Sequence, residues 1–393
     1  MDGVAVTGLI IAGIAAIAAG VVVAPTSRAS RLAKVAENIS QFKRYYNELG
    51  RTQVSLNEDA LRISPASWRH GEIPLLVQAG WIPDRPMPLA AISLSLHEDS
   101  TSVDRLVDRS RILNGLDLSG PITYSKAVTE IAGMDHFTNG SIYRPMSVGL
   151  LGQGLRMEFE LARYFEYLDT SEILSYEKSS GRKKCEYREK LGDPFDFRNR
   201  VSSMGILTLT LQRGQAGSTF MMHRRNSAKV VLGSDLFHVV PAGEFTPSDI
   251  SLESARNDLS LWRNIAREYS EELLGTVDAQ GQGGRRIDYN EEFPYKELAH
   301  ATSSGELQIS ILGLGLDPLS WKPELLTVAI FKDEVFKTIF GEKMAGNYEG
   351  TIIPNIEFTE ENIQHYIRNS NTRLGAKACL QLTWQNRIEL GLL

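Results

Sequence analysis

The sequence predicts an α+β protein in which a mixed β-sheet, sandwiched between helices, occupies the second half of the chain. After residue 200, short apolar segments rich in β-branched residues are bounded by turn residues, a pattern typical of strands. We expect strands at 205–212, 219–225, 237–243, 306–317 and 324–331. Between the third and fourth of these, Leu261, Ile265, Tyr269 and Leu273 recur at every fourth position, which predicts an amphipathic helix within 259–275. Strands on either side of such a helix favour a layered architecture.

The composition is that of an ordinary globular protein with room for two or three domains. The chain has 393 residues, of which 42% are hydrophobic and 23% charged, so a sizeable core is expected. Its formal net charge is −6 at pH 7, which argues against nucleic acid as a partner because nucleic-acid binding usually needs a basic surface. The two cysteines, Cys185 and Cys379, are too few for a disulfide framework and do not form a CxxC metal motif.

The N-terminal segment predicts a membrane anchor. No charged residue occurs at 3–27, and the apolar run 4–24 would span roughly 31 Å as a helix, close to the thickness of a hydrocarbon core. The run lacks the basic start of a signal peptide, so we expect a retained transmembrane helix at 4–24 that makes the lipid membrane a partner. Arg28, Arg31 and Lys34 follow the run and predict a single-pass membrane protein whose C-terminal domain is cytoplasmic.

Changes in residue pattern divide the chain into five parts. The predicted parts are a transmembrane helix at 4–24, a juxtamembrane amphipathic helix at 27–49, an α+β accessory region at 51–195, the sheet domain at 200–345 and a C-terminal helical extension at 346–393. Gly50 is a suitable stop for the juxtamembrane helix. The accessory region has an alternating strand pattern at 90–96 and a polar stretch at 179–194 that is typical of an exposed loop. The extension contains a helix pattern at 359–369.

The helix predicted within 259–275 carries a dense acidic group. In the stretch REYSEELLG, Glu268, Glu271 and Glu272 stand at positions i, i+3 and i+4, on adjacent turns of one helix. Such carboxylates repel one another, and a hard divalent cation such as Mg²⁺ or Mn²⁺ would neutralise them. Arg267, next to them, is suited to hold one carboxylate in a bidentate pair. A solvated acidic helix face is the alternative interpretation of the same residues.

The order of these features resembles the Nudix hydrolase superfamily. The family's box reads Gly, five residues, Glu, seven residues, Arg-Glu, an apolar residue, any residue, Glu-Glu, any residue, Gly. Here Gly243 matches the leading glycine, 267–272 matches the Arg-Glu-apolar-any-Glu-Glu core, and Gly275 matches the closing glycine one residue late. The strand at 219–225 is similar to the family's second strand before the box. The resemblance covers about 200–340.

The chain departs from the family's box in the loop before the helix. Arg267 follows Gly243 by 24 positions instead of 14, which indicates a ten-residue insertion. The first glutamate of the box has no direct match, and Asp249 or Glu253 are the candidates to replace it. These departures bear on the substrate geometry more than on metal binding, because the three core glutamates are present.

The resemblance implies specific roles for the box residues. Three glutamates would bind Mg²⁺ (or Mn²⁺) and form the catalytic set with the neighbouring arginine: Glu268, Glu271, Glu272 and Arg267. Gly243 and Arg225 would contact the substrate. The general base would be a box glutamate or Glu324, for which an ordinary loop carboxylate is the alternative. His223 and His238, on predicted strands nearby, are expected to be structural.

The function that follows is a membrane-anchored Nudix-type hydrolase. It would cleave a pyrophosphate bond in a nucleoside diphosphate derivative, with the metal neutralising the diphosphate. Two other hypotheses stay open at this point. One is a Nudix-like nucleotide-sensing module without turnover, which the stretched loop and the missing first glutamate favour. The other is a membrane adaptor whose acidic helix is only a solvated face. The sequence is compatible with a homo-oligomer and does not specify the substrate.

Overall fold

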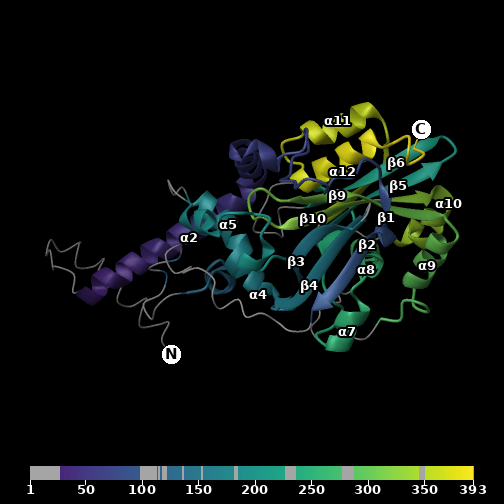
Figure 1. The fold of residues 1–393 in the computed structure, drawn as a ribbon. Helices are drawn as coiled ribbons and strands as arrows, with labels where there is room; N and C mark the ends of the chain where they lie inside the picture. Colours follow the sequence, from purple (N-terminus) through teal and green to yellow (C-terminus); the bar gives the residue numbers. More distant parts are fainter. Residues whose placement is uncertain are drawn as a thin grey trace.

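The protein contains helices and mixed β-sheets, which is compatible with the predicted α+β class (Figure 1). The computed structural model describes residues 27–97, 113, 116, 122–134, 137–151, 154–180, 185–225, 236–276, 287–344 and 350–392. Within these residues the strands form a larger and a smaller sheet, and helices pack around both.

The larger sheet is mixed and has eight strands in the described part of the chain. Its order is β1-β9-β10-β5-β6-β11, with β7 paired to β6 and β8 paired to β5. β5 and β10 run parallel, whereas the other pairs are antiparallel. The strands are β1 (Met87–Pro88), β5 (Gly205–Gly214), β6 (Gly217–Arg225), β7 (Leu236–His238), β8 (Ala242–Glu244), β9 (Leu307–Leu316), β10 (Pro323–Lys332) and β11 (Gly350–Glu357).

Each strand predicted after residue 200 is present, but one of them is divided. The segment 237–243 forms β7 and β8, and Val239, Val240 and Pro241 lie between them. Proline has no N–H group to donate to a strand ladder, which explains the break. The Pro241 carbonyl still accepts a hydrogen bond from the Thr208 N–H, at 2.9 Å, so this segment stays beside β5.

Helices cover both faces of the larger sheet. Leu207 of β5 lies beside Gly375 of α12, because a Cβ on that glycine would stand 2.3 Å from Leu207 Cδ1. Thr210 points to the opposite face, and its hydroxyl pairs with that of Tyr269 of α8 at 2.6 Å. Figure 1 shows α11 and α12 on one side of the sheet and α8, α9 and α10 on the other. These helices are α8 (Leu261–Leu274), α9 (Tyr295–Ser303), α10 (Asp333–Ile339), α11 (Glu360–Arg368) and α12 (Leu374–Gln385).

The larger sheet extends past residue 345, into the stretch predicted as a helical extension. There β11 pairs with β6 at the edge of the sheet, and α12 packs on β5 and β10. The sequence of β11 gives a weak strand signal because Pro354 lies within it and most of its side chains stay exposed or half-exposed. Proline is tolerated on such an edge strand.

The accessory region contains the smaller sheet and contributes β1 to the larger one. The smaller sheet has the order β2-β4-β3 in the described residues, with β2 (Ile92–His97), β3 (Ser141–Leu151) and β4 (Gly154–Arg163). The strand predicted at 90–96 is β2, two residues later at its start. β1 pairs with β9 through Met87 and Ile311, so the accessory region and the larger sheet share hydrogen bonds.

Short helices complete the accessory region. They are α3 (Tyr124–Lys126), η5 (Ala127–Ile131), α4 (Tyr164–Tyr167), η6 (Leu168–Glu172), α5 (Ile173–Ser179) and α6 (Glu186–Leu191), with single 3-10 turns at Ala66–Trp68 and Leu89–Ala91 and, beyond this region, at Phe197–Asn199 and Gly341–Lys343. The polar stretch predicted as an exposed loop contains α6, whose Tyr187 and Leu191 side chains are buried. The prediction missed this helix because its apolar residues are few.

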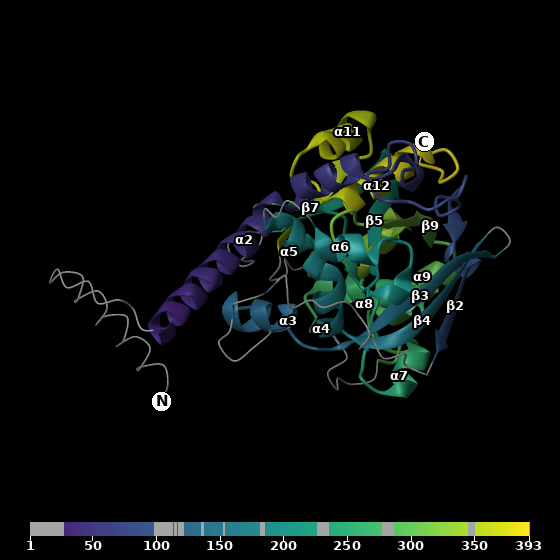
Figure 2. The same ribbon diagram turned by 60° about the vertical axis from the view of Figure 1, so that its left-hand side comes forward.

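The helix predicted at 27–49 is longer than expected. α2 spans Ser27–Ile63, and Gly50 is a helical residue within it. A single glycine costs a helix interior only about 1 kcal/mol, and the buried residues Tyr46 and Val54 hold the helix on either side of it. The N-terminal half of α2 extends away from the body of the protein in both views (Figures 1 and 2).

The predicted membrane localisation needs correction. The span expected at 4–24 lies outside the described residues. Among the residues that are described, no helix combines the length and the apolar character that crossing a bilayer requires. This finding contradicts the prediction of a single-pass membrane protein.

Candidate functional site

Helix α8 holds the acidic residues in a well-defined orientation. The Ser260 side chain caps its first turn by accepting a hydrogen bond from the Arg263 N–H at 3.4 Å. Gly275 ends the helix in the left-handed conformation, with φ 67°, which favours glycine. The predicted apolar stripe is buried: Leu261, Ile265, Tyr269 and Leu273. Burial of the stripe fixes the rotation of the helix and therefore the direction of its acids.

Glu268 lies directly against β8. A Cβ built on Gly243 would stand 2.0 Å from the carboxyl carbon of Glu268 and 2.1 Å from both of its carboxylate oxygens. A contact this short would force the carboxylate to move, so glycine at this position leaves the space that the carboxylate occupies. The leading glycine of the predicted box and a glutamate of its core are thus in contact.

Glu272 contacts the residue before this glycine. Its Oε1 accepts a hydrogen bond from the Ala242 N–H at 3.2 Å. Its Oε2 lies 3.9 Å from Nδ1 of His223, a distance that allows an ion pair and is too long for a hydrogen bond. Glu272 and His223 are 5% and 1% exposed. Two carboxylates from successive turns of α8 therefore meet two successive residues of β8.

Glu271 takes a different position from the other two acids. Its side chain is partly exposed, and its backbone carbonyl accepts the N–H of Gly275 at the end of the helix. In the part of the chain that the structure describes, no group of three or more His, Cys, Asp or Glu side chains is placed to hold a metal ion by itself. The predicted binding of one or more Mg²⁺ ions by the three glutamates stays a prediction, whereas Glu268 and Glu272 both reach β8.

Arg267 is buried and bonds to the inserted loop. Its guanidinium donates to the Tyr289 hydroxyl at 2.7 Å, to the Thr246 carbonyl at 2.5 Å and to Asn264 Oδ1 at 3.0 Å. It also lies 3.8 Å from a carboxylate oxygen of Asp258. The sequence suggested that this arginine holds a core glutamate of the box, but these contacts tie α8 to the loop that precedes it and to the segment that follows it.

Asp258 is the acid before the helix that contacts Arg267, and a replacement of the first box glutamate by Asp249 or Glu253 stays a prediction. Asp258 is 1% exposed and accepts hydrogen bonds from the Ser248 N–H, at 2.8 Å, and from the Tyr289 hydroxyl, at 3.1 Å. Glu253 is exposed on α7 (Leu252–Asn257), and the Asp249 carboxylate accepts the N–H of the next residue. The sequence analysis did not single out Asp258, because its contact with Arg267 depends on the path of the loop and not on a motif position.

The accessory region supports the inserted loop from outside. The Tyr143 hydroxyl on β3 donates to the Ala255 carbonyl at 2.7 Å. Its N–H donates to the Phe245 carbonyl at 3.3 Å, and the two rings lie 4.6 Å apart between centroids. Both contacts come from β3, so the accessory region holds the loop before α8 at Phe245 and at Ala255.

Arg225 closes β6, where its backbone pairs with Leu236 of β7 and Gly350 of β11. A substrate contact from its side chain remains a prediction. His223 and His238 face each other across β6 and β7. His238 Nδ1 accepts the N–H of Val239 at 2.8 Å, which agrees with a structural role for that histidine.

Glu324 lies on the other face of the sheet from the box. It pairs with Gly205 of β5, which pairs with Glu244 of β8, so these residues point to one side. Gly243, the neighbour of Glu244, faces Glu268 on the opposite side. The Glu324 carboxylate instead touches the first turn of α12, where a Cβ on Gly375 would stand 2.3 Å from Oε2. Glu324 is therefore separated from the box acids by the sheet.

Glu324 belongs to a cluster of ionisable groups between the sheet and η6. Lys322 forms an ion pair with Glu244, and the Tyr167 hydroxyl donates to Glu172 at 2.8 Å. Desolvation by burial raises the pKa of Glu324 to about 7, and Asp317 adds to the effect. Desolvation likewise raises the pKa of Glu172 to about 7, against the opposing effect of its hydrogen bond from Tyr167.

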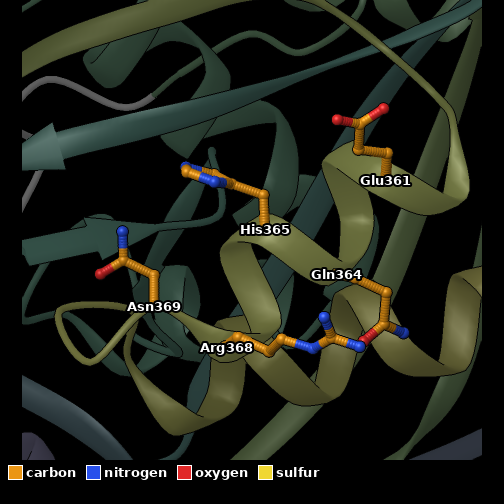
Figure 3. Close-up of a pocket in the computed structure, with 5 residues that line it drawn as sticks. All are labelled: Glu361, Gln364, His365, Arg368 and Asn369. Atoms are coloured by element: carbon orange, nitrogen blue, oxygen red, sulfur yellow. The ribbon is translucent and has the colours of Figure 1, made fainter.

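A shallow surface pocket lies on α11, away from the box (Figure 3). It is lined by Glu361, Gln364, His365, Arg368 and Asn369. The buried Tyr366 of the same helix packs on Phe220 of β6, 5.9 Å between ring centroids. Phe220 and His223 point to opposite faces of that strand, so the pocket and Glu272 lie on different sides of the sheet.

Comparison with known proteins yields a slight likeness in structure and none in sequence. No protein-family model matches the chain, and no curated protein matches it. Among solved structures, it is similar to the crystal structure of a NUDIX hydrolase from Alicyclobacillus acidocaldarius, with 11% sequence identity, 49% of this chain and 95% of that chain covered, and a TM-score of 0.29. A likeness at this level concerns the fold alone and carries no inference about activity.

Proposed function

We propose that this chain is a Nudix-type hydrolase that cleaves a phosphoric anhydride bond in a nucleoside-diphosphate-linked substrate with the help of Mg²⁺ or Mn²⁺. The observation that carries the proposal is the meeting of Glu268 and Glu272 with Gly243 and Ala242. These contacts bring the leading glycine of the Nudix-like box next to two of its core glutamates, although a long loop separates them in the sequence.

These residues fit a hard cation that is shared with a phosphate ligand. Mg²⁺ in proteins is usually held by one or two carboxylates, with substrate phosphates and water completing its shell. Glu268 and Glu272 supply such a pair, and the space at Gly243 lets a carboxylate lie against the strand backbone. Bound there, the ion would neutralise phosphate charge and polarise the anhydride that is cleaved.

The chain itself would contribute orientation and a proton acceptor. Phosphoryl transfer needs little covalent chemistry from a protein, so positioning and charge stabilisation dominate. The Ala242 N–H fixes one oxygen of Glu272, and the Arg267–Asp258 contact fixes the loop beside the helix. Because Glu324 lies across the sheet, a box glutamate is the better candidate for the general base. Glu271, which is partly exposed, would take the proton of the attacking water on a carboxylate oxygen.

A nucleotide-binding module without turnover is the second candidate. Two observations favour it. Among the described residues, no three acidic or other ligating side chains are placed to hold one metal ion. The Arg267 guanidinium also donates hydrogen bonds to Thr246 in the preceding loop and to Tyr289. Both candidates place a nucleoside diphosphate beside β8. They differ in whether the bond is broken.

The experiment that separates them measures turnover and binding on the same full-length protein. Nucleoside diphosphate sugars, dinucleotides, NAD and nucleoside triphosphates are incubated with Mg²⁺, with Mn²⁺ and with a chelator, and released phosphate or nucleotide is quantified. Metal-dependent release from any of them supports the hydrolase. Binding of a nucleotide by calorimetry without release in any metal supports the module. A folded protein that neither binds nor cleaves these compounds contradicts both candidates.

A further inference from the structure

His223 is held in a fixed orientation between two elements of the proposed site. It lies on β6 and is 1% exposed. A Cβ on Gly350 of β11 would stand 2.4 Å from its Nε2, so glycine there leaves room for the imidazole. The opposite edge of the ring, at Nδ1, faces Glu272 Oε2 at 3.9 Å. The ring therefore reaches from β11 to α8, with one nitrogen toward each.

Glu272 is the more buried of the two acids that reach β8, and its two oxygens have different surroundings. Oε1 accepts the Ala242 N–H at 3.2 Å, while Oε2 faces the imidazole. A carboxylate that is 5% exposed is costly unless polar groups compensate its charge. A backbone N–H on one side and an imidazole on the other restrict the plane in which this carboxylate can lie.

We infer that His223 is a positioning residue that orients Glu272 toward the cation of the proposed reaction. The inference rests on the proposed function and deepens it, because it names the side chain that prepares one of the two acids. Groups that support a metal-binding carboxylate from behind commonly change metal affinity about 10- to 100-fold when they are removed. His223 would act through Glu272 and would touch neither the substrate nor the ion.

Two amide substitutions separate this role from a merely structural one. In His223→Asn the amide nitrogen takes a place close to Nδ1, so a polar group still faces Glu272. In His223→Gln the amide reaches toward the place of Nε2, so the side facing Glu272 is lost. His238→Asn is the matched control, because His238 is also buried, on the adjacent strand, and contacts the backbone of Val239.

The affinity of the full-length protein for Mn²⁺, measured by electron paramagnetic resonance without substrate, is the primary readout. We expect His223→Gln to weaken Mn²⁺ binding about tenfold or more, and His223→Asn and His238→Asn to stay within about threefold of the unmodified protein. Circular dichroism checks that each variant is folded. In turnover assays, the half-saturating Mg²⁺ concentration should rise for His223→Gln in the same proportion.

The outcomes distinguish this inference from the proposed function. If the unmodified protein binds Mn²⁺ and hydrolyses a substrate, but both His223 variants bind Mn²⁺ equally well, the positioning role is refuted and the hydrolase stands. If the unmodified protein neither binds Mn²⁺ nor hydrolyses any substrate, the proposed function fails and the inference fails with it. If only His223→Gln loses Mn²⁺ affinity and the unmodified protein hydrolyses a substrate, both the positioning role and the proposed function are supported.

Discussion

The carboxylate of Glu268 occupies the space in which a side chain on Gly243 would begin, 2.0 Å from the place of its Cβ. The contact joins a three-residue strand to the middle of α8, on the side of the sheet that this helix covers. It explains why a glycine suits the middle position of β8. Since the contacting group is the end of a flexible side chain, the contact constrains the acid more than it constrains the fold.

Gly243→Ala should therefore reduce activity without unfolding the protein. The new methyl group displaces the Glu268 carboxylate, which can rotate away at little cost. Misplacement of a reacting group by about 1 Å can lower a rate about 100-fold, so we expect kcat/KM to fall by at least tenfold while the unfolding midpoint in urea stays nearly the same. Gly149→Ala on β3 is the control, because a Cβ there meets nothing within 4 Å. Unchanged kcat/KM in Gly243→Ala would show that the position of Glu268 does not matter for turnover.

Asp258→Ala should lower stability strongly. The aspartate is 1% exposed and faces Arg267, which is 3% exposed. Removing one partner leaves the other charge buried without compensation, at a cost of about 3–5 kcal/mol. Urea unfolding followed by circular dichroism measures the change. Glu253→Ala, at the exposed acid of the same inserted loop, should stay within about 0.5 kcal/mol. A similar small effect for both variants would mean that the Arg267–Asp258 contact does not hold the loop.

The cluster between η6 and the sheet predicts that stability falls as the pH rises. Glu172 and Glu324 both have pKa values raised from 4.5 to about 7 in the folded protein. Because the folded state retains these protons longer than the unfolded state, the contribution is complete below pH 4.5 and is lost as the pH rises through 7. Each group is partly exposed, so solvent screening keeps its contribution below about 3 kcal/mol.

Replacing both acids tests this pH dependence. In Glu172→Gln/Glu324→Gln the free energy of unfolding, measured in urea at intervals between pH 5 and pH 8, should change less with pH than in the unmodified protein. Glu334→Gln, at an exposed acid on α10, should keep the original slope. If the free energy of unfolding changes equally with pH in all three proteins, Glu172 and Glu324 are not the groups that titrate.

The elements that position the site were predictable from sequence where one pattern dominates. Helix α8 begins after Ser260 and ends at Gly275, and its stripe of apolar residues follows the helical period. Strands β5, β9 and β10 are buried on both faces and read as continuous apolar runs, because helices cover the sheet on both sides. These features depend on local sequence alone.

Features that depend on distant contacts were not predictable. The acid that reaches Arg267 is Asp258, since the path of the inserted loop selects it. Glu324 was a candidate base, but strand register places it across the sheet from Glu268. Edge strand β11 has no buried residue and lacks a clear apolar alternation. In each case the position of the residue depends on a contact with a segment outside its own local pattern, so the local sequence does not predict it.

Glutamine variants of Glu268 and Glu272 test whether these two acids form one metal-dependent hydrolytic site. With a substrate found in the screen and saturating Mg²⁺, kcat/KM is measured for Glu268→Gln, Glu272→Gln and the exposed control Glu334→Gln. We expect kcat/KM to fall about 100-fold for each of the first two, which corresponds to about 3 kcal/mol of transition-state stabilisation, and to stay unchanged for the control. Equal kcat/KM in all three variants, or hydrolysis that persists in a chelator, would contradict such a site.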